Sequence, residues 1–298
     1  MEMMKVLFLG TGNAIPTKLR NHSGILVSFA KENILVDCGE GIQRQLRIAG
    51  ITPGKISRIL ITHWHGDHML GLPGLFQTLA MSNYERTLKI YGPPGTRRHV
   101  NLIEELLLGL KINLQVHELT TTLVDEKDFY IESKPMDHGT PTNAYSIVLK
   151  ERRRLDKKKL KKYKLPNSPL LGQLQEGQNV TYEGKLIKAS AVSYVEEGKK
   201  LAIILDTKMN SQAIVLAKDA DLLITESTFS QEEKERALEY KHLTAADAGT
   251  IAKKAKVKKL ILTHISERYE HNFKKIEREA KKIFRNTLVA KDFDHFVL

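Results

Sequence analysis

The sequence predicts an α/β fold in which two β-sheets pack face to face and helices cover their outer faces. Two observations carry this prediction. Short apolar strands alternate with amphipathic helices along the chain. The segment Ile-Leu-Ile-Thr-His at residues 59–63 is nearly repeated as Leu-Ile-Leu-Thr-His at residues 260–264. The near-repeat indicates two similar halves, each a sheet with its helices, that present polar residues at their strand ends along one shared edge.

The expected elements follow from their hydrophobic patterns, which have period two in strands and three- or four-residue spacing in helices. Gly, Pro, Asn and Asp residues separate them. We expect strands at residues 4–9, 24–29, 33–37, 58–62, 88–91, 112–119, 128–134, 143–149, 201–207, 219–228, 258–264 and 287–297. We expect helices at residues 42–47, 69–79, 96–108, 242–255 and 271–284.

One segment departs from this alternation. Residues 151–164 hold nine Lys or Arg and two acidic residues, a net charge of +7 out of +12 for the chain. The segment through residue 185 has little core pattern, so we expect a basic projection inserted at about 151–185 into one domain that spans residues 1–298. A charge run is usually a solvated face, but this clustering, with Tyr163 among the cations, favours contact with nucleic-acid phosphates.

The composition sets the broad class of protein. With 298 residues, 41% of them hydrophobic and 28% charged, the chain has enough apolar residues for a full globular core. We expect neither a transmembrane helix nor a secretory signal, because no run of 18 apolar residues occurs and a strand begins near the amino terminus. The single cysteine, Cys38, suits a reducing cytoplasm. It is expected to be a small buried residue rather than a nucleophile or metal ligand.

Four potential metal ligands follow the strand at 58–62 within six residues. They are His63, His65, Asp67 and His68. His63 and His65 are two apart, so at an extended strand end they point to the same side, and Gly66 permits the turn that brings the other two back. The whole chain has 11 histidines, so three in this stretch are not expected by chance. Imidazole and carboxylate ligands suit Zn²⁺.

Three more candidate ligands lie in the same context, at the end of an apolar strand. They are His138, Asp206 and His264. Seven nitrogen and oxygen ligands are too many for one tetrahedral ion, and they suit two ions that share a carboxylate and activate a water molecule. The absence of a thiolate ligand argues against a purely structural zinc. Hydrolysis is therefore favoured over redox chemistry, although ligand type alone leaves a di-iron centre open.

Several motifs together resemble the ribonuclease Z family, the short-form tRNA 3′-processing endonucleases of the metallo-β-lactamase superfamily. Residues 63–68 match the HxHxDH motif of the superfamily, and residues 16–21 (Pro-Thr-Lys-Leu-Arg-Asn) match the family's PxKxRN loop. Residues 35–41 resemble its first motif, and residues 137–139 and 263–269 resemble its third and fifth. The resemblance runs essentially from end to end.

The resemblance implies an αββα sandwich, a homodimer, two Zn²⁺ per subunit with Mn²⁺ as an alternative ion, and precursor tRNA as the substrate. It implies that His63, His65 and His138 hold one ion, that Asp67, His68 and His264 hold the other, and that Asp206 bridges them. Asp67 would also orient or deprotonate the attacking water. The insert at 151–185 takes the place of the family's protruding arm, which grips the tRNA elbow. The substrate-binding residues expected from the loop and the arm are Lys18, Arg20, Lys157, Lys158, Lys159, Lys161 and Lys162.

Two further residues stand where the family has an acid–histidine pair. Glu226 occupies the place of the Glu of the HEAT motif, here Thr-Glu-Ser-Thr, and His242 that of the His of the HST motif, here His-Leu-Thr. Such a pair beside the metals would protonate the leaving 3′ oxygen, although capping a strand end and a helix is the ordinary alternative. The arm also departs from the family, with Asn-Ser-Pro at residues 167–169 in place of its Gly-Pro motif.

The sequence therefore predicts a cytoplasmic, zinc-dependent endoribonuclease that removes the 3′ trailer of precursor tRNA and leaves a 3′-hydroxyl. The alternative within enzymes is a small-molecule phosphodiesterase or arylsulfatase of the same superfamily, which the basic insert and the PxKxRN loop disfavour. A basic RNA-binding protein with a merely structural metal is the alternative outside enzymes. A DNA-directed nuclease lacks support, because no extra domain of that kind is visible.

Overall fold

The computed structural model describes residues 3–109 and 111–298, and two compact units are distinguished. The larger unit contains residues 3–125, 131–147 and 200–298, and the smaller one contains residues 126–130 and 148–199. The smaller unit therefore includes the whole insert expected at 151–185 and extends beyond it on both sides. Among the described residues, no helix combines the length and the apolar character needed to span a membrane.

The first sheet of the larger unit has the strand order β18-β1-β2-β3-β4-β5-β6. Each neighbouring pair from β3 to β6 is parallel, whereas the pairs β18–β1, β1–β2 and β2–β3 are antiparallel. The sheet is thus mixed. Its strands are β1 (Lys5–Gly10), β2 (Gly24–Phe29), β3 (Glu32–Val36), β4 (Arg58–Leu60), β5 (Thr87–Gly92), β6 (Asn113–Glu118) and β18 (His295–Val297).

The second sheet has the order β17-β16-β15-β14-β9-β8-β7, and its strands from β14 to β17 are parallel. Some of its strands run on into the smaller unit. They are β7 (Thr122–Asp125), β8 (Phe129–Asp137), β9 (Pro141–Leu149), β14 (Lys199–Ile204), β15 (Leu222–Glu226), β16 (Leu260–Thr263) and β17 (Thr287–Val289).

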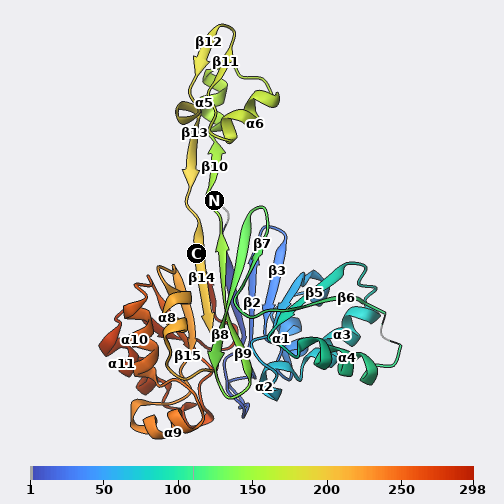
Figure 1. Ribbon diagram of the computed structural model, residues 1–298, viewed down its shortest axis with the longest axis vertical. Helices are drawn as coiled ribbons and strands as arrows, with labels where there is room; N and C mark the ends of the chain where they lie inside the picture. Colours follow the sequence, from blue (N-terminus) through green and yellow to red (C-terminus); the bar gives the residue numbers. More distant parts are fainter. Residues whose placement is uncertain (1–2, 110) are drawn as a thin grey trace. The chain divides into compact units, whose positions relative to one another are not determined.

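Helices flank both sheets of the larger unit (Figure 1). The first sheet is covered by α1 (Ile42–Ile48), α3 (Leu72–Met81) and α4 (Thr96–Leu106), and the second by α8 (Ser211–Ala217), α10 (Ala245–Lys254) and α11 (Phe273–Ile283). Shorter elements join them. These are α2 (Gly66–Met69), α9 (Lys234–Glu239), η1 (Pro53–Lys55), η2 (Gln231–Glu233) and η3 (Glu267–Tyr269).

Side-chain alternation explains why both faces of each sheet are covered. In the first sheet, Leu26 and Leu35 pack in the cluster beneath the helices, while Ile25 and Ile34 on the opposite face are equally buried. In the second sheet, Ile204 likewise packs in the apolar cluster beneath the helices, and the side chains on the opposite face of the strand are buried as well. The predicted fold class, two packed mixed sheets between layers of helices, is confirmed.

The carboxyl-terminal segment differs from its prediction. One strand was expected at 287–297, but the structure has two, β17 and β18, which belong to different sheets. Between them the backbone N–H of Ala290 donates to Leu262 O in one sheet, and that of Phe293 donates to Phe8 O in the other. Phe293 has a positive φ of 70°. This turn redirects the chain, so β18 closes the edge of the first sheet beside β1.

The smaller unit has a core of its own, which the sequence pattern did not indicate. Leu174, Val180, Ile187, Ala189 and Val192 are buried together in it. Its strands β10 (Arg152–Leu155) and β13 (Ser193–Glu196) pair antiparallel, as do β11 (Val180–Tyr182) and β12 (Lys185–Ile187). Its helices are α5 (Lys157–Lys162), α6 (Pro169–Gln175) and α7 (Ala189–Val192).

Candidate metal centre

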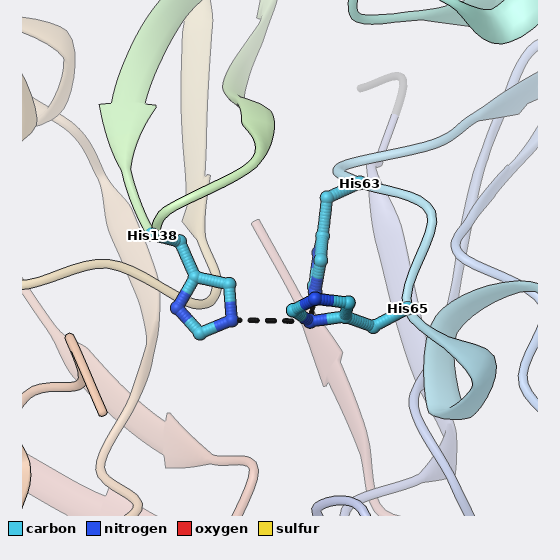
Figure 2. A group of neighbouring side chains, drawn as sticks. All are labelled: His63, His65 and His138. Carbon is cyan, nitrogen blue, oxygen red and sulfur yellow. Dashed lines mark hydrogen bonds between the residues drawn. The ribbon is translucent and has the colours of Figure 1, made fainter.

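Three histidines converge from two separate loops of the larger unit (Figure 2). His63 and His65 follow β4, and His138 lies in the turn between β8 and β9. His63 Nε2 lies 3.0 Å from His65 Nδ1, and His138 Nε2 lies 3.3 Å from the same atom. The three ring nitrogens are thus directed at one point, and the three residues form one possible metal-binding group.

A second group of ligand atoms consists of Asp67, His68, Asp206 and His264. His68 Nε2 and His264 Nε2 are 3.2 Å apart, and Asp67 Oδ2 lies 3.2 Å from the first and 3.3 Å from the second. Asp67 is placed by the short helix α2, and the other three residues are almost fully buried. The structure therefore brings together the seven candidate ligands of the sequence analysis.

Asp206 lies between the two groups. Its Oδ2 is 3.6 Å from His63 Nε2, 3.5 Å from His138 Nε2 and 3.4 Å from His68 Nε2. Its Oδ1 is 3.2 Å from His264 Nε2, yet none of the described residues donates a hydrogen bond to this buried oxygen. The helix that follows Asp206, α8, is capped by Asn210 instead. A buried carboxylate whose two oxygens together approach four imidazoles, one of these oxygens without a donor, has the geometry that a bridging metal ligand requires.

Hydrogen bonds on the far side of the rings fix their orientation. Thr62 Oγ1 donates its only proton to Asp37 Oδ2 (2.7 Å), so the 3.1 Å contact with His63 must be donated by His63 Nδ1. His68 Nδ1 donates to the same oxygen of Asp37 over 2.6 Å. His138 Nδ1 donates to the carbonyl of Lys241 over 3.0 Å. Each of these rings therefore presents the lone pair of Nε2 to the cluster, as metal-ligating histidines do.

His264 is oriented in the same way from the second sheet. Thr228 Oγ1 donates to Glu226 Oε2 over 2.6 Å and accepts from His264 Nδ1 over 2.9 Å. The lone pairs of His68 and His264 consequently face each other across 3.2 Å. Two unprotonated ring nitrogens repel in that arrangement, whereas a cation between them, a proton or a metal ion, is stabilised by both. The residues present fit divalent metal ions.

The electrostatics of the cluster also favour a cation. Burial raises the pKa of Asp206, but His264, His68 and His242 outweigh burial and hold that pKa well below its ordinary value. Burial lowers the pKa of His68, but Asp206, Asp37 and Asp67 raise it well above its ordinary value. The carboxylates therefore stay ionised and attract positive charge, which is what a metal site requires.

Glu226 and His242 form a pair beside the cluster. His242 Nδ1 lies 3.0 Å from Glu226 Oε1 and 3.1 Å from Oε2, and the buried carboxylate also accepts from Thr207 N (2.7 Å). Burial lowers the pKa of His242, but Glu226 and Asp206 outweigh it and raise that pKa to about 9. The alternative role of helix cap belongs to Thr244, whose side chain and Asp247 form a capping box at α10. Two further possible metal groupings include His242, one of them with Glu226.

A cavity of about 390 Å³ opens onto this cluster. Its lining comes from three parts of the larger unit: the loop at Asn13 and Ala14, the ligand loops, and the turn at residues 239–242. The cavity leaves Asp67, Asp206 and His242 accessible to a ligand.

The two loop cations are placed differently from each other. Lys18 is exposed. Arg20 is only 3% exposed, and its Nη1 donates to Thr11 Oγ1 and to Ala290 O, each over 2.7 Å. Arg20 therefore fixes the loop against the turn that precedes β18 instead of presenting its guanidinium to solvent. Cys38 is buried, as expected, and burial raises the pKa of its thiol.

The five expected lysines of the insert lie in the smaller unit, all exposed on helix α5. Asp156 caps this helix by accepting from Lys158 N and Lys159 N, and Leu160 packs against the unit's apolar cluster. The helix thus turns one apolar residue inward and its lysines outward.

Sequence reasoning missed the residues that orient the ligands. Asp37, Thr62, Thr228 and the carbonyl of Lys241 act mostly through contacts between segments that are distant in sequence. Asp37 did carry two signals, since it ends a buried strand as His63 and His264 do and lies in the stretch 35–41 that resembles a family motif, but neither signal indicated that it orients ligands.

Comparison with known proteins agrees with this geometry. A family model described as "Anti-Pycsar protein Apyc1" matches residues 4–155, which include His63, His65 and His138 but end before Asp206 and His264. A solved metallo-β-lactamase fold protein from Bacillus subtilis, YhfI, superposes with a TM-score of 0.74 over 100% of both chains at 20% identity. Human tRNase Z, short form, superposes with a TM-score of 0.72 at 28% identity over 98% of both chains.

Curated relatives match over nearly the whole chain. Ribonuclease Z of Methanothermobacter thermautotrophicus is 40% identical over 97% of this chain and 95% of the relative. The ribonuclease Z of Enterococcus faecalis is 37% identical over 98% and 96%, and that of Nanoarchaeum equitans is 35% identical over 97% and 92%.

The sandwich and its His/Asp cluster define a metal-dependent hydrolase of the metallo-β-lactamase fold. The first half of the chain belongs to the family that the matching model describes, and the chain as a whole belongs to the ribonuclease Z family. It is therefore an endoribonuclease.

Proposed function

We propose that the chain removes the 3′ trailer from precursor tRNA by hydrolysing one phosphodiester bond, with two zinc ions at the His/Asp cluster. The observation that carries the proposal is Asp206, whose two oxygens approach histidines of both ligand groups while Oδ1 has no hydrogen-bond donor. Membership of the ribonuclease Z family supplies the substrate class. Mn²⁺ is proposed as an alternative ion, since the nitrogen and oxygen ligands accept both.

The ligand atoms divide between two positions. His63, His65 and His138 would hold one ion, Asp67, His68 and His264 the other, and Asp206 would bridge them. Such a pair lowers the pKa of a water molecule toward neutrality and offsets negative charge that develops on a phosphate. Five of these seven side chains are buried, whereas His65 is exposed and Asp67 is partly exposed, and both of them line the cavity.

The chain's own residues would handle the protons. Asp67 lines the cavity and would orient the attacking water by accepting one of its protons. His242 would donate a proton to the 3′ oxygen as it leaves, which yields a 3′-hydroxyl on the tRNA and a 5′-phosphate on the trailer. Glu226 supports that role, because its carboxylate holds Nδ1 of the ring and stabilises the protonated imidazole.

Lys157, Lys158, Lys159, Lys161 and Lys162 would bind phosphates of the tRNA body. Five exposed ammonium groups on the six-residue helix α5 favour salt-sensitive contact with an RNA backbone and little base readout. Lys18 would contact the acceptor end. Arg20 would act through the conformation of its loop, since its guanidinium is bonded internally.

A homodimer in the cytoplasm completes the proposal. Dimerisation rests on the family resemblance, and sedimentation of the purified protein would test it. A reducing compartment suits a chain whose one cysteine is buried and unpaired.

The first test is cleavage of a 3′-extended precursor tRNA with the product end mapped. Cleavage next to the discriminator base that stops with chelator and returns with Zn²⁺ or Mn²⁺ is expected. A small phosphodiester is assayed in parallel. Its rapid hydrolysis without cleavage of the RNA would favour the small-molecule alternative, and RNA binding without cleavage of either substrate would favour a binding protein.

A further inference from the structure

The turn that follows α9 lines the cavity and also contacts a candidate metal ligand. Lys241, the second residue after this helix, has a positive φ of 55°. Its backbone N–H donates to Leu238 O, which closes the helix, and its carbonyl accepts from His138 Nδ1. The backbone of Lys241 thereby helps to orient a candidate ligand. This function requires no particular side chain, so the lysine side chain needs a separate explanation.

The ammonium group of Lys241 is held at the mouth of the cavity. Nζ lies 2.9 Å from Asp137 Oδ1, and the Nζ of Lys208 lies 2.8 Å from Asp137 Oδ2. The side chain of Lys241 passes over Gly139, where a Cβ would meet its Cδ at 3.8 Å and its Nζ at 3.9 Å. Lys241 and Gly139 line the same cavity as Asp67, His138 and Asp206.

Asp137 positions both lysines without neutralising them. Two ammonium groups share one carboxylate, so this cluster of three residues keeps a net charge of +1. Lys241 and Lys208 are 39% and 42% exposed, and ion pairs at that exposure contribute little and exchange readily. Each ammonium has three donors, of which the contact with Asp137 uses one. Donors therefore remain for a further anion.

We infer that Lys241 and Lys208, held by Asp137, bind a backbone phosphate of the RNA adjacent to the one that is cleaved. The inference rests on the proposed function, because only a polynucleotide carries a second phosphate next to the reacting one. The lysine pair would hold the chain across the cavity and so place the scissile phosphate against the ligand cluster. Lys241 would then be a positioning residue for the reaction.

A glycine at position 241 separates the side chain from the backbone. Glycine adopts a positive φ without strain, so K241G should keep the carbonyl that orients His138 while it removes the ammonium group. Lys256 provides a matched control. It follows α10 with a φ of 56° and is exposed, at the opposite end of β16 from His264. K256G makes the same backbone change and removes the same charge away from the cavity.

The expected result is specific to position 241. K241G should raise KM for precursor tRNA on the order of 5- to 10-fold, with a smaller change in kcat. The slope of log KM against log salt concentration should fall by about 0.7 to 0.9, the value for one lost phosphate contact. K256G should match the wild type in KM and slope. Metal content is measured in each protein, and K241G should retain it.

A second variant, which removes a negative charge from the cavity instead of a positive one, tests the inference if K241G loses metal or fails to fold. Glu239 lines the same cavity and carries a negative charge. E239Q should lower KM for the RNA and leave metal content unchanged. If K241G, in its metal-loaded form, has the KM and salt slope of K256G, the inference is wrong. An E239Q protein with a raised KM would overturn it as well.

Equilibrium binding of the same RNA at several salt concentrations is measured beside cleavage. A wild-type protein that does not cleave would refute the proposed function. The binding slopes of the two glycine variants would still test the lysine pair. If the wild type cleaves and the two variants bind alike, the lysine assignment alone fails.

Discussion

Replacing Asp37 by Asn should weaken zinc binding, although Asp37 is not among the candidate ligands. Its carboxylate accepts three hydrogen bonds, from Thr62 N and Thr62 Oγ1 at 2.7 Å and from His68 Nδ1 at 2.6 Å. Its φ of 58° is a conformation that Asn tolerates well, so the backbone should not move. In either orientation of the Asn side chain, its NH₂ group faces a group that donates a hydrogen bond to Asp37 in the wild type. Two donors then meet, and at least one hydrogen bond is lost.

The magnitude follows from the ring of His68. An Asn NH₂ beside Nδ1 favours the tautomer whose proton lies on Nε2, the atom that faces Asp206 and His264. Loss of such an orienting carboxylate costs roughly 10- to 100-fold in metal affinity, or about 1.4 to 2.7 kcal/mol. Competition with a chromophoric chelator measures this affinity directly.

A matched control isolates the metal effect. Asp292 also accepts hydrogen bonds that are partly buried, from Thr11 Oγ1 and from Asn21 N at 2.7 Å, but it is not among the candidate metal ligands. D292N should lose stability and keep zinc affinity. If D37N bound zinc as tightly as D292N does, the tautomer argument would be refuted.

Four other changes have distinct expected outcomes. H242A should lower kcat on the order of 10²- to 10⁴-fold with metal content preserved, and a similar loss of zinc would make His242 a ligand. Reversing the charges of Lys157–Lys162 should raise KM for precursor tRNA and flatten its salt dependence with little change in kcat. R20M should lower the free energy of unfolding, measured in urea, by about 2 to 4 kcal/mol, because the buried partners of Arg20 lose their hydrogen-bond donor. If R20M instead raised KM for the RNA without lowering stability, Arg20 would contact the RNA directly. Burial raises the pKa of Glu32, but hydrogen bonds from Arg58 and Ser57 outweigh burial and lower that pKa in the folded protein. The ionised Glu32 therefore stabilises the fold above about pH 4.3, the ordinary pKa of Glu, and this stabilisation is lost as the pH falls through the lower pKa of the folded state. The urea midpoints of the wild type and E32Q should converge over that pH range.

The sequence predicted what local patterns encode. The stretch around His63 carries four candidate ligands in six residues, so no knowledge of the fold was needed to find them. His138, Asp206 and His264 are lone residues, and they became candidates only because each ends an apolar strand. That reasoning works for His63, Asp206 and His264 because parallel strands place their carboxyl ends at one edge of a sheet, whereas His138 lies in the turn between β8 and β9. The structure brings all seven side chains together.

The sequence could not predict interactions that depend on strand order. Asp37 reaches Thr62 because β3 and β4 are neighbours, and 21 residues without any marker of this pairing separate the two strands. The division of residues 287–297 between two sheets depends on the partners β1 and β16. The burial of Arg20 was not predicted, because its charge is offset by internal acceptors and by nearby acids such as Asp292, which no local pattern shows.

The backbone around the metal cluster explains why such a site is costly to fold. Asp37, His264 and Lys241 all have positive φ values, between 55° and 58°, and Gly139 has 81°. At Asp37 and His264, each of which directly follows a strand, this conformation turns the chain sharply. Each non-glycine residue in it costs about 1 to 3 kcal/mol. Glycine would relieve the strain at Asp37 or His264 only by removing the functional side chain. The strain is therefore tied to one candidate ligand, His264, and to one residue that orients a ligand, Asp37, and the hydrogen bonds of Asp37 and Thr228 hold these residues in place against it.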